Sequence, residues 1–242
     1  MTNKISSCLE YLADHADFSK NFPSIAEVKT RSIITACGET PDLVNDTFLV
    51  IGQSIIPYGL RGSDVTVLDG YKSIANVDCI QKRATATLEE MASNGRKFDW
   101  VIAPDEWLTY FTSEDDQRNA IQRISRVTKK GFFTTSKDYK NMHSSQRYFE
   151  EPFVLRTTTG DAIIVRRRVW DHHDRQKWSQ ENFVVHGEQL YLAAPVTRRT
   201  MYFKQMAKFS SDAGAISFKV EKDNMYKPMF SKIFEYVICI KF

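Results

Sequence analysis

Two short apolar segments near the start of the chain constrain its fold most strongly. The first, TFLVIG, ends at Gly52, and the second, DVTVLD, ends at Asp69. Both are rich in β-branched residues and bounded by glycine or polar residues, which favours neighbouring parallel strands of a buried sheet over helices. A glycine after one strand lets a ligand approach the backbone, and an acid after the next can accept hydrogen bonds from ribose hydroxyl groups. The pattern therefore predicts a nucleoside-cofactor site.

The composition is that of a globular protein. A hydrophobic share of 42% over 242 residues is sufficient for the core of one large α/β domain, and we predict a single domain over 1–242. The net charge of +3 gives no indication of a nucleic-acid partner.

The cysteine pattern and the N-terminus indicate the compartment. The four cysteines are scattered, with no CxxC pair and no spacing typical of a zinc site. They are expected to be reduced thiols, which favours an intracellular protein. The N-terminus lacks the apolar segment of a signal peptide, and no run approaches the roughly 18 apolar residues of a membrane span. We predict a cytoplasmic protein with no membrane partner; the oligomeric state stays open.

Two helices are predicted in residues 1–40. Apolar residues at helical spacing indicate a short amphipathic helix over about 3–15. A second helix is predicted to begin at a capping box formed by Ser24 and Glu27, and to end at Gly38.

The connections after the first two strands are unusually short. Residues 53–63 and 70–76 leave little room for crossover helices. The predicted elements that follow are the third strand at VDCI, 77–80; a helix at 84–95; a buried strand at 98–103; a helix that begins at Ser113 and ends at Lys129, Lys130 and Gly131; and a strand at 131–136.

Residues 150–197 change to alternating segments joined by turn residues. Two antiparallel hairpins are predicted, with turns at 159–161 and 186–188. They form an insert or lid. A helix at about 199–214 and two strands, AISFKVE and FEYVICIKF, complete the chain.

In this order, the segments resemble the class I S-adenosylmethionine-dependent methyltransferases, and within them the branch with short first crossovers. The resemblance covers residues 47 to about 136 and 200–242. It rests on the loop from Gly52 to Pro57 and Tyr58, on Asp69, on VDCIQKRATATL as the third-strand motif, on FDWVIAPDEWLTYF, on RISRVTKKGFFTTS, and on the last helix with its closing strand pair. It implies a Rossmann-like three-layer fold with a mostly parallel sheet and an antiparallel C-terminal strand pair, into which the hairpins are inserted.

The resemblance implies S-adenosylmethionine as the cofactor. The chain departs from the family pattern in three places: Val50 replaces an acid, Gln53 and Ser54 replace further glycines after Gly52, and Arg83 replaces the aspartate that recognises adenine. Because arginine cannot accept a hydrogen bond, adenine would be recognised by the backbone or by Gln81. The positions that match cofactor-binding residues are Gly52, Gln53, Ser54, Asp69, Gly70, Gln81, Arg83, Ala84 and Pro104.

Acidic and aromatic residues follow the fourth motif. Asp105 and Glu106 lie where this fold places groups that face the acceptor, and are predicted to act as a catalytic base or a polar anchor. A solvated turn is the alternative. The predicted substrate residues are Trp107, Tyr110, Tyr139, Trp170 and His172. The aromatic residues after the strand are alternatively core residues, and WDHHDRQKW, 170–178, is alternatively an ordinary polar loop. The adjacent His172 and His173 point apart, so no metal is predicted.

Three functions agree with these patterns. The first is a methyltransferase that acts on an unidentified small-molecule acceptor. The second, suggested by Val50, Ser54 and Arg83, is a catalytically inactive methyltransferase-like protein with a role in binding or assembly. The third is a nucleic-acid methyltransferase, which the net charge does not indicate.

Overall fold

The structure is a computed structural model of the 242-residue chain. It describes residues 38–39, 41–51, 64–68, 77–104, 106–142, 147–150, 152–157, 160–192, 195–222 and 235–242. The helices predicted before Gly38 lie outside the described residues. Gly38 itself has a positive φ of 67°, a conformation that glycine adopts readily.

The described chain contains two sheets of six strands each. The first sheet is mixed, with the order β2-β1-β3-β4-β12-β11. Strands β2, β1, β3 and β4 run parallel to one another. Strand β12 is antiparallel to β4, and β11 is antiparallel to β12. The strands are β1 (Thr47–Ile51), β2 (Asp64–Leu68), β3 (Phe98–Ala103), β4 (Thr128–Lys137), β11 (Ser217–Lys222) and β12 (Glu235–Lys241). The predicted Rossmann-like sheet with an antiparallel C-terminal strand pair is confirmed.

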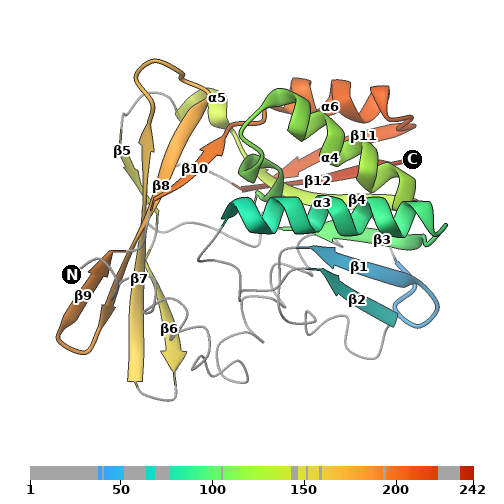
Figure 1. Ribbon diagram of the computed structural model, residues 1–242. Coiled ribbons are helices and arrows are strands. Elements are labelled where there is room, and N and C mark those ends of the chain that lie inside the picture. The colour runs from blue at the N-terminus through green and yellow to red at the C-terminus, as the bar shows by residue number, and fades with distance from the viewer. Residues whose placement is uncertain are drawn as a thin grey trace.

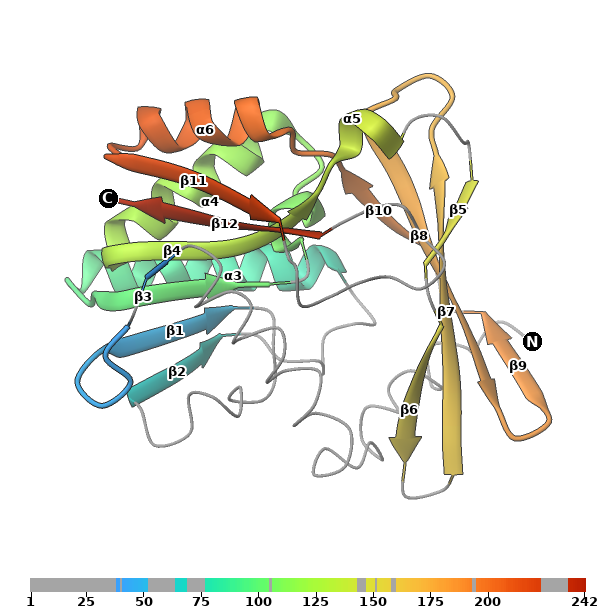
Figure 2. The ribbon, with the colours of Figure 1, turned by 180° about the vertical axis from the view of Figure 1, so that it is seen from behind.

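Three helices lie on one face of the mixed sheet, as the opposite views in Figures 1 and 2 show. They are α3 (Val77–Ser93), α4 (Glu114–Val127) and α6 (Phe203–Asp212). Their apolar stripes pack on strand residues such as Leu49, Val101 and Phe132, all fully buried. The opposite face of the sheet forms a second buried cluster that contains Val50 and Trp100.

The start of α3 corrects one prediction. The apolar run at 77–80 is not a third strand, because it forms the first turn of a helix that continues to Ser93. In the sequence, Val77, Ile80, Ala84 and Leu88 recur at helical spacing, so the run continues the apolar stripe of the following helix. The predicted end at Asn94 and Gly95 is nearly right, and Gly95 has a positive φ of 69°.

Helix α4 begins as predicted and ends earlier. The Ser113 side chain caps it by accepting a hydrogen bond from the Asp116 backbone, and acids occupy its first turn. The helix ends at Val127, and Lys129, Lys130 and Gly131 already belong to β4. The β-branched Thr128 begins the strand, which is therefore longer than predicted.

The second sheet is antiparallel and contains both predicted hairpins, β6–β7 and β8–β9. Its main path is β10-β8-β7-β5, with β6 beside β7 and β9 beside β8. The helix predicted from residue 199 begins only at Phe203, because residues 196–199 form an edge strand. The strands are β5 (Arg147–Phe149), β6 (Phe153–Thr157), β7 (Gly160–Trp170), β8 (Lys177–His186), β9 (Gln189–Leu192) and β10 (Val196–Arg199).

Candidate functional site

The carboxyl ends of the parallel strands form the edge at which the candidate site lies. Strand β1 lies between β2 and β3, so the chain moves outward on one side of β1 and returns on the other. A reversal of this kind is the topological switch point at which open α/β sheets bind ligands. The last residues of β1 and β2, Ile51 and Leu68, pair in register, so both strands leave the sheet at the same level.

Most of the predicted cofactor residues cannot be placed. Gly52, Gln53, Ser54, Asp69 and Gly70 lie outside the described residues, and their roles stay predictions. The backbone at Gln81 and Arg83 is helical, but their side chains also lie outside the described part.

Two other predicted cofactor residues, Ala84 and Pro104, are buried. Val50, which replaces an acid of the family pattern, is buried too. Ala84 packs with Leu88 in the core under the helices, and Pro104 is buried directly after β3. Val50, at the position of the missing acid, belongs to the cluster on the other face of the sheet. Its side chain therefore serves the core of the fold.

Glu106, two residues after Pro104, has an unusual backbone conformation. Asp105 lies outside the described residues, whereas Glu106 is buried with a left-handed φ of 57°. Its N–H donates to the Thr135 hydroxyl at 3.2 Å, and its carbonyl accepts from the Thr109 hydroxyl at 2.7 Å. The loop after β3 is thereby fixed to β4 and to the short helix η3 (Trp107–Tyr110).

The Glu106 carboxylate meets groups from three other elements. Arg168 of β7 donates to it from Nη2 at 2.5 Å and from Nη1 at 3.3 Å. The Tyr139 hydroxyl, from the short helix α5 (Tyr139–Met142), also donates to it. Lys137 Nζ, at the end of β4, lies 3.8 Å away. Because Arg168 belongs to the antiparallel sheet, this contact joins the two sheets.

Arg168 also holds a second carboxylate. Its Nε donates to Glu150 Oε1 at 2.5 Å, and Lys137 donates to the same oxygen at 3.2 Å. Arg166 Nη1 lies 4.0 Å from the other Glu150 oxygen. The fully buried guanidinium of Arg168 thus bridges Glu106 and Glu150.

Arg198 of β10 makes a second connection to the same loop. It donates to the Glu106 carbonyl at 3.0 Å, to the Thr109 hydroxyl at 2.8 Å and to Gln180 Oε1 at 2.7 Å. Its guanidinium lies 3.8 Å from the centre of the Tyr110 ring. The Arg198 hydrogen bonds to Glu106 and Thr109 join the loop after β3 to the antiparallel sheet, and the bond to Gln180 orients the Arg198 side chain.

The charges of this network shift the pKa values of its members. Burial alone would raise the pKa of Glu106, but Arg168, Lys137 and Arg198 together hold it well below its usual range. The Glu150 pKa is lowered in the same way against the effect of burial. Burial, together with the negative charge of Glu106, raises the pKa of Tyr139. At neutral pH both carboxylates are ionised and the phenol is protonated.

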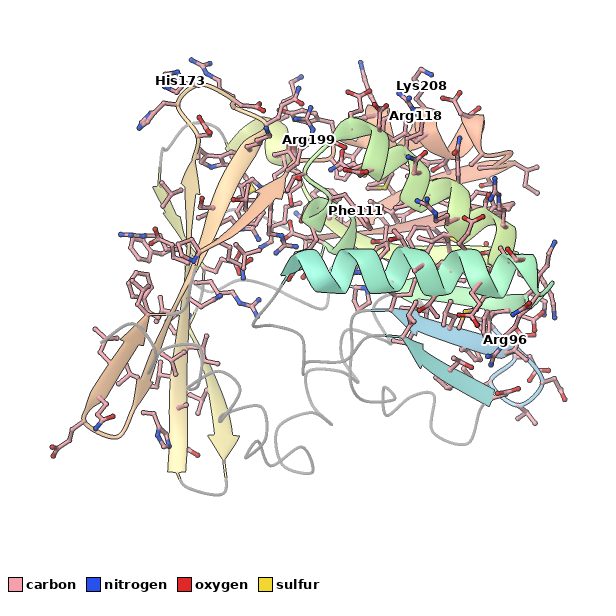
Figure 3. The ribbon with its side chains drawn as sticks, in the orientation of Figure 1. Arg96, Phe111, Arg118, His173, Arg199 and Lys208 are labelled. Atoms are coloured by element: carbon pink, nitrogen blue, oxygen red, sulfur yellow. The ribbon has the colours of Figure 1, made fainter. Side chains whose placement is uncertain are left out.

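The structure separates the predicted acceptor residues into two groups. Tyr139 and Trp170 are buried beside the Glu106 network, with their ring centres 6.2 Å apart, and Tyr110 stacks on Arg198. Trp107 instead belongs to the helix-side core, where it packs on Phe111. His172 is exposed in the β7–β8 turn, and Figure 3 shows its neighbour His173 at the tip of that turn.

The sequence analysis missed Arg168, Arg198, Lys137 and Glu150. A signal was present for Arg168. In the sequence, Ala162, Ile164 and Trp170 are apolar at alternate positions, which predicts that Arg168, at the same spacing, faces inward with them. In the structure all four are buried. A buried guanidinium requires a carboxylate partner. The alternation alone does not identify that partner, because Glu106 lies 62 residues away in the chain.

Two further searches covered the described ranges only. Within them, no three His, Cys, Asp or Glu side chains gather in a way that could bind a metal ion. None of the helices in the same ranges is long and apolar enough to span a bilayer.

Comparisons with known proteins identify the fold. No protein-family model matches the sequence, and no curated protein matches it. Among solved structures, the methyltransferase CcbJ from Streptomyces caelestis is similar with a TM-score of 0.54 and 13% identity, covering 88% of this chain and 95% of the other. CalS10, an amino pentose methyltransferase from Micromonospora echinaspora, has a TM-score of 0.54 and 11% identity, covering 91% and 92%.

A third similar structure is an S-adenosylmethionine-dependent methyltransferase from Clostridium acetobutylicum, with a TM-score of 0.50 and 16% identity, covering 91% of this chain and 95% of the other. These identities are low, so the likeness is one of fold. The chain has the Rossmann-like fold of class I S-adenosylmethionine-dependent methyltransferases.

Proposed function

We propose that the protein is an S-adenosylmethionine-dependent methyltransferase that acts on a small-molecule acceptor. The observation that carries this proposal is the sheet order β2-β1-β3-β4-β12-β11 with reversed β12, which creates the switch point between β1 and β3. The similar fold of CcbJ and of CalS10 supports it.

The described strand ends fit a nucleoside cofactor. Ile51 and Leu68 are paired neighbours at the ends of β1 and β2. Gly52 and Asp69 directly follow them in the sequence. In this proposal Gly52 allows the cofactor close to the backbone, and Asp69 accepts hydrogen bonds from the ribose hydroxyls. When bound, S-adenosylmethionine supplies an electrophilic methyl group.

The antiparallel sheet would supply the acceptor side. Methyl transfer depends mainly on alignment of donor and acceptor. Arg168 and Arg198 fix this sheet to the loop after β3, beside the predicted cofactor edge. We assign Glu106 to positioning within this proposal, because an ionised carboxylate with a strongly lowered pKa is a weak general base.

The acceptor class is the finer part of the proposal. CalS10 is an amino pentose methyltransferase, which makes amino sugars the first acceptors to test. A neutral amine needs little more than orientation toward the methyl group, in agreement with the positioning role of Glu106. The net charge of +3 gives no indication of a nucleic-acid acceptor.

Calorimetric titration tests the cofactor. We expect S-adenosylmethionine and its demethylated product to bind, and Asp69→Ala to weaken the affinity at least about tenfold through loss of hydrogen bonds to a charged acceptor. Asp64→Ala is the matched control, because Asp64 is exposed at the start of β2, the strand that precedes Asp69 in the sequence. The control should bind like the wild type.

Absence of binding by either compound would refute the cofactor and the proposed function with it. Transfer of a labelled methyl group to amino sugars then separates the enzyme from the inactive alternative. Binding without transfer to any acceptor of a broad small-molecule panel would favour the inactive scaffold. Transfer to nucleic acid alone would contradict a small-molecule acceptor.

A further inference from the structure

The face of the antiparallel sheet opposite the Glu106 network carries exposed apolar side chains. They come from β6, β7, β8 and β9, whose free ends extend beyond the layer of helices (Figure 1). Val154, Ile163, Val185 and Leu190 are 51%, 44%, 37% and 67% exposed. The register places them directly opposite one another across four strands, so their side chains form one continuous row.

Two more rows lie beside the first on the same face, which we call the outer face. The next row along the strands is Val165, Phe183 and Leu192. The third is Phe149, Arg167 and Glu181, in which Arg167 Nε donates to Glu181 at 2.7 Å.

This pattern departs from that of an ordinary solvent-exposed sheet. An antiparallel sheet covered on one face alternates apolar residues inside with polar residues outside. Here Ala162, Ile164 and Val184 are buried on the inner face, while their chain neighbours Ile163 and Val185, on the outer face, are apolar as well. A contiguous exposed apolar surface of this kind marks an interaction site.

The charge of the outer face restricts its partner. Within the three rows, the charged residues are Arg167 and Glu181, which are opposite in sign and pair with each other. The three rows therefore have no basic excess of the kind that binds nucleic acid or anionic lipid headgroups. An apolar surface that carries one ion pair of opposite charges is complementary to a second copy of itself.

We propose that the outer face binds a second copy of this chain and forms a symmetric dimer. A two-fold axis parallel to the strands, between β7 and β8, places β7 of one copy over β8 of the other. Each row then meets the same row: apolar residues face apolar residues, and Arg167 faces Glu181 of the second copy. The contact is isologous and closes at two copies.

The dimer has a familiar packing geometry. Two sheets that pack face to face lie about 10 Å apart with strand directions rotated by about 30°. Both faces of the antiparallel sheet would then be covered. This inference does not depend on the proposed methyltransferase activity.

Sedimentation equilibrium of the full chain tests the dimer. The wild type should have twice the monomer mass of 28.0 kDa. Ile163→Lys should raise the dissociation constant at least about tenfold, because it places a charge within an apolar row of the contact. Ile216→Lys is the matched control, since Ile216 is 80% exposed and lies just before β11.

A charge exchange tests the geometry. Arg167→Glu and Glu181→Arg should each weaken self-association, because like charges then face each other. Mixed together, the two variants should form a heterodimer, in which every Glu faces an Arg. Circular dichroism checks that each variant is folded, and Leu190→Lys at the edge strand replaces any variant that is not.

A wild type that sediments at 28.0 kDa over the whole concentration range would overturn the dimer, even if it binds neutral vesicles. A wild-type dimer that Ile163→Lys and Leu190→Lys leave intact would overturn the assignment to this face. Failure of the two charge variants to associate on mixing would overturn the proposed axis.

Discussion

At the scale of single residues, Glu106 meets two unfavourable conditions that its neighbours offset. Its charge is buried, and its backbone is left-handed without being glycine. Two arginines, a lysine and a phenol surround the carboxylate and its carbonyl, and Thr135 accepts from its N–H. The residue is fixed by contacts on both its main chain and its side chain.

Glu106→Gln should therefore be strongly destabilising. The amide keeps the volume of the side chain, but it removes the charge that faces Arg168. We expect a loss of about 3 kcal/mol in the free energy of unfolding, measured by urea titration. Glu114→Gln, at an exposed pair with Arg118, is the control and should change stability by less than about 0.5 kcal/mol. Equal effects of the two changes would contradict a buried cross-link.

The lowered pKa of Glu106 should make the free energy of unfolding depend on pH. The folded pKa of Glu106 lies below the usual value of 4.5, so the unfolded state binds more protons between the two values. The stabilisation is complete above the unfolded pKa and is lost as the pH falls through the folded pKa. The difference in unfolding free energy between wild type and Glu106→Gln should narrow from about pH 6 to about pH 3.

Urea titrations of both proteins at several pH values measure this difference. The variant should retain the part of the slope that comes from Glu150, whose pKa is also lowered. A difference that stays constant over the whole range would show that the Glu106 charge contributes nothing to stability.

The network could be predicted from the sequence only in part. Glu106 was identified as an acid at the end of a strand, because that position follows from a local pattern. Its partners come from β7, β10 and α5, far along the chain. Local patterns contain no information on how two sheets meet. Arg168 and Tyr139 therefore could not be identified from the sequence as the partners of Glu106.

At the scale of elements, Gly131 of β4 leaves space for the Trp100 ring of β3. A β-carbon at this position would lie 2.7 Å from Trp100 Cζ3 and 3.2 Å from the Ile240 carbonyl oxygen. The Trp100 ring also stacks on Phe133, with 5.1 Å between ring centres, and donates to Asp46 at 2.6 Å. The ring is thus held in place over the glycine.

Gly131→Ala should lower the free energy of unfolding by about 1–3 kcal/mol, because neither the ring nor the backbone oxygen can move freely. Urea titration measures the loss. In a Trp100→Leu background the same change should cost less, since the ring atom that it meets is gone. An identical cost in both backgrounds would mean that the contact with Trp100 is unimportant.

The elements themselves were largely predictable, because each has a local period and clear end signals. Strand β3 and the Ser113 cap of α4 are examples. The prediction of a strand at 77–80 was wrong, because a short apolar run fits a strand or a buried helix equally well. Edge strand β10 was missed because Val196–Arg199 contains two arginines and directly precedes a helical pattern.

At the scale of the whole molecule, the antiparallel sheet is an insertion within the mixed sheet. Its strands come between β4 and β11 in the chain, and Figure 2 shows it beside the carboxyl end of β4. Its connection to the mixed sheet includes the buried ion pairs around Arg168 and the Arg198 hydrogen bonds. A polar junction of this kind requires specific geometry, because each buried charge must keep its partners.

This junction should make the two sheets unfold together. In hydrogen exchange at increasing urea, wild-type peptides from β3 and β7 should become exposed at the same denaturant concentration. Arg168→Lys keeps the charge but loses the planar fork that bridges Glu106 and Glu150, so β7 should open at lower urea than β3. Arg175→Lys, in the exposed β7–β8 turn, should behave like the wild type. Separate opening of β3 and β7 in the wild type would mean that the junction does not couple the sheets, and the antiparallel sheet would then be a mobile lid instead of a fixed wall.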